Sequence, residues 1–120
     1  MAAAAAAGIP LTRRFTARRV QFVTGHDANG QLPADLNLPA LADPLASTVI
    51  FMGKRTFPAL ATQLIAHGLP ADHPAILAEA VSTPDQRVDR STIRDLANRL
   101  LKDVGPSPAL IVYGPLAELD

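Results

Sequence analysis

The residues Ser47-Thr48-Val49-Ile50-Phe51-Met52-Gly53 form a run of strand-forming residues that ends at a glycine. A continuous apolar run of this length predicts a strand that is buried on both faces of a sheet. A helix pattern follows at once, from a candidate N-cap at Thr56 to about His67, with Gly68 as the C′ residue. A buried strand that leads directly into a helix indicates an α/β domain.

Four more segments carry strand patterns, and one carries a second helix pattern. The strands are predicted over residues 19–23, 75–81, 86–90 and 109–113, and the helix from an N-cap at Ser91 to about residue 103. The segment 86–90 is short and polar, which predicts a place at the sheet edge or beside a cleft. Residues 31–46 are broken by prolines and predict a loop with one or two short helical turns. We therefore expect an α/β fold, a single domain in which a mostly five-stranded mixed sheet is flanked by helices.

The spacing of apolar residues predicts which side of each helix faces the core. The inward positions are Leu60, Leu64 and Ile65 with Phe57 or Ala61 on the first helix, and Ile93, Leu96, Ala97, Leu100 and Leu101 on the second. The loop over 31–46 adds an apolar face made of Leu36, Leu38, Leu41 and Leu45. Together these positions predict a core that lets a domain of 120 residues fold without disulfides.

The composition excludes several classes of protein and of site. With 48% hydrophobic and 18% charged residues, the chain is expected to fold rather than to remain disordered. Cysteine is absent, which excludes disulfides and thiolate zinc sites, and the three histidines lack the spacing of metal ligands. The net charge is zero and no apolar run approaches a membrane span. We therefore expect no metal, no nucleic-acid partner and no membrane partner.

The N-terminal segment is rich in alanine and arginine, and no acidic residue precedes Asp27. This composition is also typical of a transit peptide. The run Ala2–Ala7 favours instead the end of a helix, because alanine has the highest helix propensity. Gly8 and Pro10 would stop that helix.

Five phrases follow one another in the order that they have in tetrapyrrole methylases. They are Gly8-Ile9-Pro10-Leu11-Thr12-Arg13-Arg14 with Val23-Thr24-Gly25-His26, Phe51-Met52-Gly53, Leu64 to Pro70, Glu79 to Arg87, and Pro108 to Gly114. No single phrase is specific, but their shared order and spacing make the chain resemble the second domain of this family. The resemblance implies that residues 1–8 are the remnant of an interdomain helix or linker, and that residues 9–120 form a C-terminal domain.

The resemblance also implies an activity, a cofactor and partners. The branch of the family that matches best transfers methyl groups from S-adenosylmethionine to two pyrrole carbons of uroporphyrinogen III. The product is precorrin-2, which feeds sirohaem and cobalamin synthesis. The implied partners are uroporphyrinogen III, the chain's own N-terminal domain and a second copy in a homodimer, and the expected compartment is the cytoplasm.

Four residues are candidates for binding roles, two from the resemblance and two from the chemistry of arginine. Met52 and Val81 correspond to family positions that contact S-adenosylmethionine, although Val81 replaces a small residue of the family with a larger one. Arg13 and Arg14 are candidate substrate anchors, because guanidinium forks suit the carboxylates that ring the substrate. Arg13 stands where the family has a histidine.

No catalytic residue is assigned. The family's Gly-rich cofactor loop, its G-G-D stretch and its acid/base carboxylate and lysine have no counterpart in the sequence. We therefore expect the chain to be inactive alone and to share S-adenosylmethionine with an N-terminal domain. The chain would contribute one wall of a cleft, in a reaction that depends mainly on positioning.

Several residues keep a second interpretation. Without the resemblance, Met52 after a strand would be a gap-filling core residue. His26 is expected to stabilise its loop by a hydrogen bond rather than to bind a metal, and Glu79 to pair with an arginine rather than to act in catalysis. Gln86 and Arg87 are expected to be a structural hydrogen-bonding pair near the cleft.

Two other functions stay open. Residues 49–57 resemble a short motif of dihydrofolate reductase whose arginine and threonine contact a nicotinamide cofactor. Binding of NADPH would test that resemblance. The chain could also be a non-catalytic interaction or dimerisation module, which sedimentation of the isolated chain would test.

Overall fold

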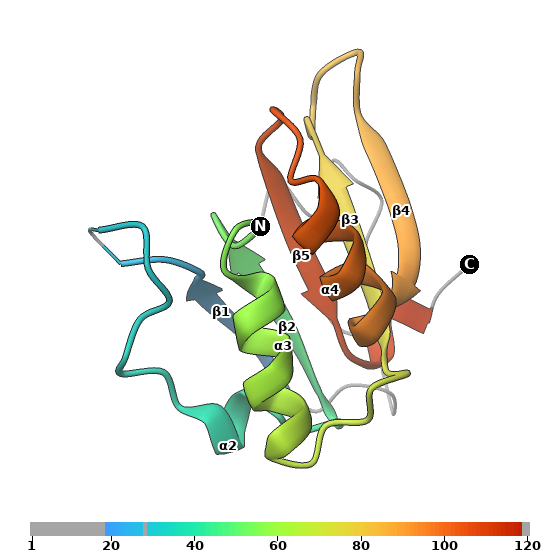
Figure 1. The fold of residues 1–120 in the computed structure, drawn as a ribbon. Coiled ribbons are helices and arrows are strands. Elements are labelled where there is room, and N and C mark those ends of the chain that lie inside the picture. Colours follow the sequence, from blue (N-terminus) through green and yellow to red (C-terminus); the bar gives the residue numbers. More distant parts are fainter. Residues whose placement is uncertain (1–18, 28, 119–120) are drawn as a thin grey trace.

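A mixed five-stranded sheet is the centre of the fold (Figure 1). The computed structural model describes residues 19–27 and 29–118. Its strands are β1 (Arg19–Thr24), β2 (Ala46–Phe51), β3 (Pro74–Glu79), β4 (Arg87–Thr92) and β5 (Ala109–Tyr113). In the sheet they lie in the order β1-β2-β5-β3-β4, where β1 is parallel to β2 and the other pairs are antiparallel. The expected fold class is confirmed, and the polar strand β4 lies at the edge, as predicted.

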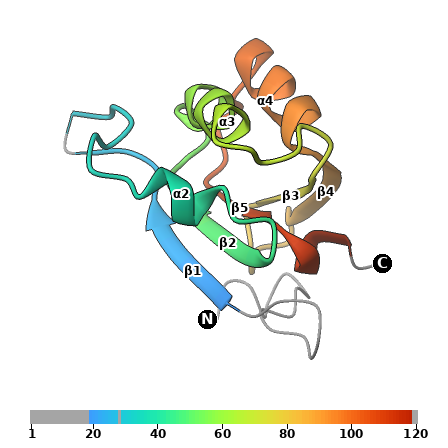
Figure 2. The ribbon, with the colours of Figure 1, turned by 90° about the horizontal axis from the view of Figure 1, so that it is seen from below.

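The helices lie on one face of this sheet, as the view from below shows (Figure 2). They are α2 (Leu38–Leu41), α3 (Phe57–Ala66) and α4 (Ile93–Lys102), and a 3₁₀ turn, η1 (Pro115–Glu118), follows β5. The single turn of α2 confirms the short helical turn expected within residues 31–46. Every helix of the described part of the chain is too short or too polar to cross a lipid bilayer.

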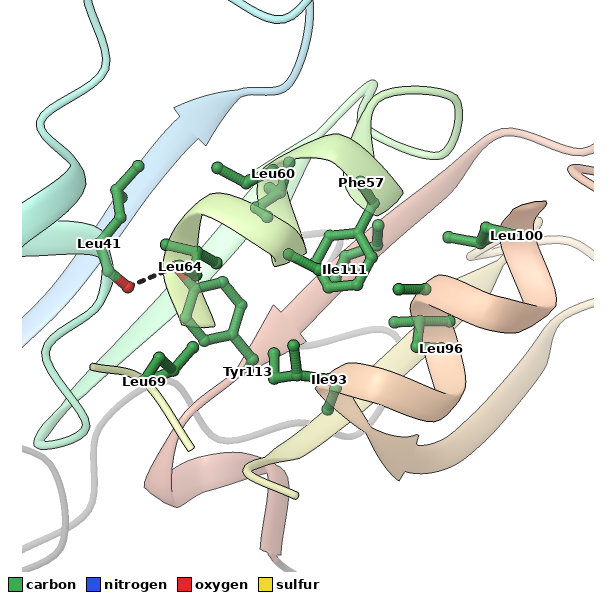
Figure 3. Close-up of a cluster of buried hydrophobic side chains, with 14 of the residues drawn as sticks. Leu41, Phe57, Leu60, Leu64, Leu69, Ile93, Leu96, Leu100, Ile111 and Tyr113 are labelled. Carbon is green, nitrogen blue, oxygen red and sulfur yellow. Dashed lines mark hydrogen bonds between the residues drawn. The ribbon is translucent and has the colours of Figure 1, made fainter. Parts of the chain in front are cut away.

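The main core lies between the helices and the sheet (Figure 3). Fully buried side chains of α3 and α4 meet those of the central strands; the largest include Phe57, Leu60, Leu64, Ile93, Leu96, Ile111 and Tyr113. The hydroxyl of Tyr113 donates a hydrogen bond of 2.6 Å to the carbonyl oxygen of Leu41, which ties β5 to α2. A second buried cluster of Val49, Ile76, Ala78, Leu110, Val112 and Ala117 includes alternate residues of the same strands. Because β2, β3 and β5 are covered on both faces, their sequences are continuous apolar runs.

Three of the predicted core positions are wrong. The side chains of Ile65 and Leu101 are 38% and 71% exposed, and Leu45 is also exposed. Leu64 and Leu100 immediately precede the two helical residues and are buried. Successive residues of a helix are about 100° apart around its axis. The residue that follows a buried one therefore no longer lies on the face that packs against the sheet.

The N-cap of α3 is at the predicted residue, whereas the N-cap of α4 differs from the prediction. Thr92 rather than Ser91 caps α4, and its hydroxyl accepts a 3.2 Å hydrogen bond from the backbone N–H of Asp95. Ser91 belongs to β4 and pairs with Ala75. Thr56 stands at the N-cap of α3 without a side-chain capping bond, because its hydroxyl donates to the carbonyl oxygen of a residue in another loop. The C′ role of Gly68 is confirmed by its φ of +102° after the last turn of α3.

Candidate functional site

The candidate site lies where three strands end at the same edge of the sheet, the upper edge in Figure 1. β1 and β2 are parallel, and β3 runs the same way because both β2 and β3 are antiparallel to β5. The loops that begin at Gly25, Met52 and Ala80 therefore leave one edge, and the loop over residues 104–108 enters β5 there. Ligand clefts of open α/β sheets form at the carboxyl ends of strands.

Two phrases of the predicted resemblance, Thr24-Gly25-His26 and Phe51-Met52-Gly53, meet at this edge. The backbone N–H of Gly25 donates a 2.6 Å hydrogen bond to the carbonyl oxygen of Phe51. The carbonyl oxygen of Gly25 accepts a hydrogen bond from the hydroxyl of Thr56, which explains the missing cap bond of α3. A Cβ atom on Gly25 would overlap the Cα atom of Gly53, so this approach requires glycine.

Met52 points out of the core from an unusual backbone conformation. Its φ is +55°, in the left-handed region that residues with a side chain rarely adopt. Its side chain is 58% exposed and lines a pocket at the sheet edge. The interpretation of Met52 as a gap-filling core residue is therefore wrong. Residues held in rare backbone conformations cluster at functional sites.

The pocket beside Met52, here called the Met52 pocket, has a volume of about 520 Å³. Three segments line it: His26 and Gly30 from the loop after β1, residues 52, 54 and 55 after β2, and residues 104–109 before β5. The last segment is mostly apolar, since it includes Val104, Pro106, Pro108 and Ala109. A largely apolar wall with a few convergent polar groups is typical of a small-molecule site, and the volume fits that class.

A buried ion pair supports one side of this pocket. The ammonium of Lys54 donates to a carboxylate oxygen of Glu79 at 2.9 Å and to the carbonyl oxygen of Ser107 at 2.8 Å. Arg99 of α4 donates to the other carboxylate oxygen of Glu79 at 3.4 Å and to Asp89 at 3.1 Å. The predicted pairing of Glu79 with an arginine is confirmed. Lys54 was not predicted as a site residue, because no local pattern links it to a carboxylate 25 residues later.

A second pocket of about 440 Å³ shares residues 104–107 with the Met52 pocket. Its charged lining includes Glu79, Asp85, Arg87, Arg99 and Asp103. Arg87 therefore lies at the second pocket and not at the Met52 pocket. The predicted pairing of Gln86 with Arg87 stays a prediction. Gln86 has a structural hydrogen bond, since its side-chain oxygen accepts from the backbone N–H of Ser82 at 2.9 Å. That bond holds the turn that contains Val81.

Val81 lies in the turn after β3, between Ala80 and Ser82, whose φ angles are +50° and +68°. Its side chain is half-buried and packs against the second buried cluster. Val81 and Met52 thus follow strands that end at the same edge, but Val81 is not among the described residues that line the Met52 pocket. A cofactor contact by Val81 stays a prediction.

His26 acts within its own loop, as expected. Its Nδ1 atom lies 2.8 Å from the carbonyl oxygen of Asp27, at hydrogen-bonding distance. The carboxylate of Asp27 accepts from the backbone N–H groups of Gln31 and Asn29, which lowers the pKa of Asp27. Within residues 19–27 and 29–118, no three histidine or carboxylate side chains gather as a metal site would require. The candidate anchors Arg13 and Arg14 and the linker over residues 1–8 lie outside the described residues.

Comparison with known sequences shows which protein family this chain is similar to. A sequence model of the Tetrapyrrole (Corrin/Porphyrin) Methylases matches residues 1–97. The S-adenosyl-L-methionine-dependent uroporphyrinogen III methyltransferase of Arabidopsis thaliana, named as chloroplastic, is 40% identical over 116 residues, which cover 97% of this chain and 31% of that protein. The uroporphyrinogen-III C-methyltransferase of Paracoccus denitrificans is 37% identical over 117 residues, which cover 98% of this chain and 40% of that protein.

Comparison with solved structures agrees. The crystal structure of uroporphyrin-III C-methyl transferase from Thermus thermophilus, complexed with S-adenyl homocysteine, matches with a TM-score of 0.77 and 29% identity. The match covers 94% of this chain and 49% of that chain. The chain thus spans less than half the length of each of these relatives. Sequence and fold lead to the same conclusion: the chain belongs to the tetrapyrrole (corrin/porphyrin) methylase family.

Proposed function

We propose that the chain is the C-terminal half of an S-adenosylmethionine-dependent uroporphyrinogen-III C-methyltransferase, with residues 9–120 as its second domain. Such an enzyme converts uroporphyrinogen III into precorrin-2. The observation that carries the proposal is Met52, which stands more than half exposed in the Met52 pocket, in a left-handed backbone conformation at a strand end. The names of the Arabidopsis and Paracoccus relatives support the substrate.

The Met52 pocket fits the proposed cofactor in size and in chemical character. It combines an exposed thioether, a mostly apolar segment before β5 and a few polar groups. When bound, S-adenosylmethionine supplies an electrophilic methyl group. The residues of this chain contribute by holding the pocket wall in place: Lys54 fixes the segment before β5 through the carbonyl oxygen of Ser107.

A complete cleft in this proposal needs a second wall, which the chain's own N-terminal domain would supply. The share of the relatives that the chain covers supports this division. Arg13 and Arg14 are proposed to anchor substrate carboxylates, and Val81 to contact the cofactor through its turn. We also propose that the parent enzyme is a homodimer. The cytoplasm is the proposed compartment, although the Arabidopsis relative is named as a chloroplast protein.

The test is a titration of the 120-residue chain with S-adenosylhomocysteine, followed by calorimetry and by the backbone amide signals in NMR. We expect weak binding, with a dissociation constant well above about 1 μM, because the other wall of the cleft is absent from the sample. The perturbed amides should be those of the Met52 pocket. Binding at 1 μM or tighter would contradict a shared cofactor site.

The role of Met52 is tested by the variant Met52→Ala, which keeps a Cβ atom but removes the thioether. Leu101→Ala is the matched control, because Leu101 is also an exposed apolar side chain and lies on α4, outside the Met52 pocket. We expect Met52→Ala to weaken binding of S-adenosylhomocysteine and Leu101→Ala to leave it unchanged. Equal affinity of the two variants would refute a contact by Met52.

A further inference from the structure

The two pockets at the sheet edge differ in charge, although residues 104–107 line both. The second pocket mixes acidic and basic side chains, including Glu79, Asp85 and Arg87. Among the described residues that line the Met52 pocket there is no carboxylate, and Lys54 and Arg55 are its cations. The Met52 pocket therefore has the electrostatic character of an anion site.

The charge of Lys54 is already compensated. Its side chain is only 8% exposed, and the carboxylate of Glu79 lies 2.9 Å from the ammonium. Glu79 in turn belongs to a network with Arg99 and Asp89 that holds two cations and two anions. A network whose charges balance attracts a ligand anion only weakly. Among the described residues that line the Met52 pocket, the uncompensated charge is therefore that of Arg55.

Arg55 is the exposed cation among the described residues that line the Met52 pocket. It is exposed, it lines the Met52 pocket, and it comes three residues after Met52. In the part of the chain that the structure describes, no carboxylate forms an ion pair with it. It lies two residues before α3, next to the N-cap Thr56, and the N-terminal dipole of this 10-residue helix adds positive potential nearby.

We propose that Arg55 binds a ligand carboxylate in the Met52 pocket, an inference that rests on the proposed function. A guanidinium presents two parallel N–H groups to a carboxylate, which gives both affinity and orientation. The apolar side chains of Met52 and Val104 would meet the uncharged part of the ligand. Two ligands of the proposed reaction carry carboxylates: the tetrapyrrole, around its ring, and the cofactor, on its amino-acid end.

The experiment uses two probes to separate these sources, uroporphyrin III and S-adenosylhomocysteine. Each is titrated by NMR into the wild-type chain, Arg55→Gln, Arg55→Lys and the control Arg90→Gln. Arg90 is exposed like Arg55 but lies on the edge strand β4, outside both pockets. Thermal unfolding of each variant checks that the fold is intact.

We expect Arg55→Gln to weaken binding of at least one probe about tenfold, which corresponds to the loss of a charge-assisted hydrogen bond. Arg55→Lys should recover part of the loss, and Arg90→Gln should bind both probes like the wild type. The probe that loses affinity identifies the source of the carboxylate. Added salt should weaken that probe's binding more in the wild type than in Arg55→Gln.

Three outcomes decide between this inference and the proposed function. If Arg55→Gln binds both probes as the wild type does, the carboxylate site is refuted, while a loss in Met52→Ala would still support the cofactor site. If the wild type binds uroporphyrin III through Arg55 but does not bind S-adenosylhomocysteine, the carboxylate site stands and the proposed function fails. If the wild type binds neither probe, both are overturned.

Discussion

The burial of Tyr113 can be tested directly, because it changes the pKa of the side chain. It is the only tyrosine, and the chain has no tryptophan, so phenolate absorbance reports this side chain alone. Burial raises the pKa of Tyr113 to about 12. We expect an alkaline absorbance titration of the folded chain to have its midpoint near this value, and the same titration in urea to fall near the ordinary value of about 10. A midpoint near 10 in the folded chain would contradict a buried hydroxyl.

The same difference in pKa makes stability depend on pH. The folded pKa of Tyr113 lies above the unfolded one, so the unfolded chain loses this proton first as the pH rises. Its contribution to the free energy of unfolding is complete below about pH 10 and is lost as the pH rises towards 12. Urea denaturation at a series of pH values should show this loss in the wild type. In Tyr113→Phe the loss should be smaller by the contribution of Tyr113. That variant should be less stable at neutral pH by about 1–3 kcal/mol, since a buried carbonyl loses its partner.

At the scale of elements, the ends of β1 and β2 are joined by the contact of Gly25 with Gly53. A Cβ atom at position 25 would overlap backbone, which cannot move as a flexible side chain can. We expect Gly25→Ala to lower the free energy of unfolding by about 2 kcal/mol through overpacking. Gly30→Ala is the matched control, because Gly30 has a φ of +73° and open space around it, so its cost of about 1 kcal/mol is conformational only. Equal losses in urea denaturation would rule out the steric account.

The loop before β5 is joined to β2 and β3 by the buried pair of Lys54 and Glu79. Removal of one partner leaves a buried charge, so Glu79→Leu should cost about 3–5 kcal/mol in urea denaturation. The double variant Lys54→Met with Glu79→Leu should lose less than the sum of the single variants, because it buries no unpaired charge at either site. The exposed pair of Arg19 and Asp43 provides the comparison. Arg19→Gln should cost no more than about 1 kcal/mol, and similar costs at both pairs would argue against a structural role for the buried one.

At the scale of the whole molecule, the sequence predicted the sheet well because its central strands are apolar on both faces. Those runs, and the polar strand at the edge, can be recognised without knowledge of their partners. The inward positions of Ile65 and Leu101 were wrong, since periodicity gives the direction of a helix face but not the width of the stripe that the sheet covers. Thr56 was correctly predicted as the N-cap of α3, but its side-chain capping bond is absent for a related reason. The hydroxyl of Thr56 donates a hydrogen bond to the carbonyl oxygen of Gly25, and no local sequence pattern predicts a partner 31 residues away.

The candidate site was predictable only in part. The resemblance predicted a cofactor contact at Met52, because the short motif Phe51-Met52-Gly53 is local in the sequence. Lys54 and Arg55, which follow it closely, were missed as functional residues. Their different roles depend on whether Glu79 lies within reach, and that distance is a property of the folded sheet. The charge that a pocket offers to a ligand can therefore be judged only in the folded structure. There the charge of Lys54 is compensated by Glu79, and no described carboxylate compensates that of Arg55.

The left-handed backbone at Met52 has a consequence for anyone who would redesign this protein. Glycine adopts that conformation at no steric cost, so a search for heat resistance would favour glycine at position 52. A search for ligand affinity would keep the thioether that stands in the pocket. The two aims select different residues at position 52. A library screened for thermal stability alone would lose the thioether from the pocket while the fold stayed intact.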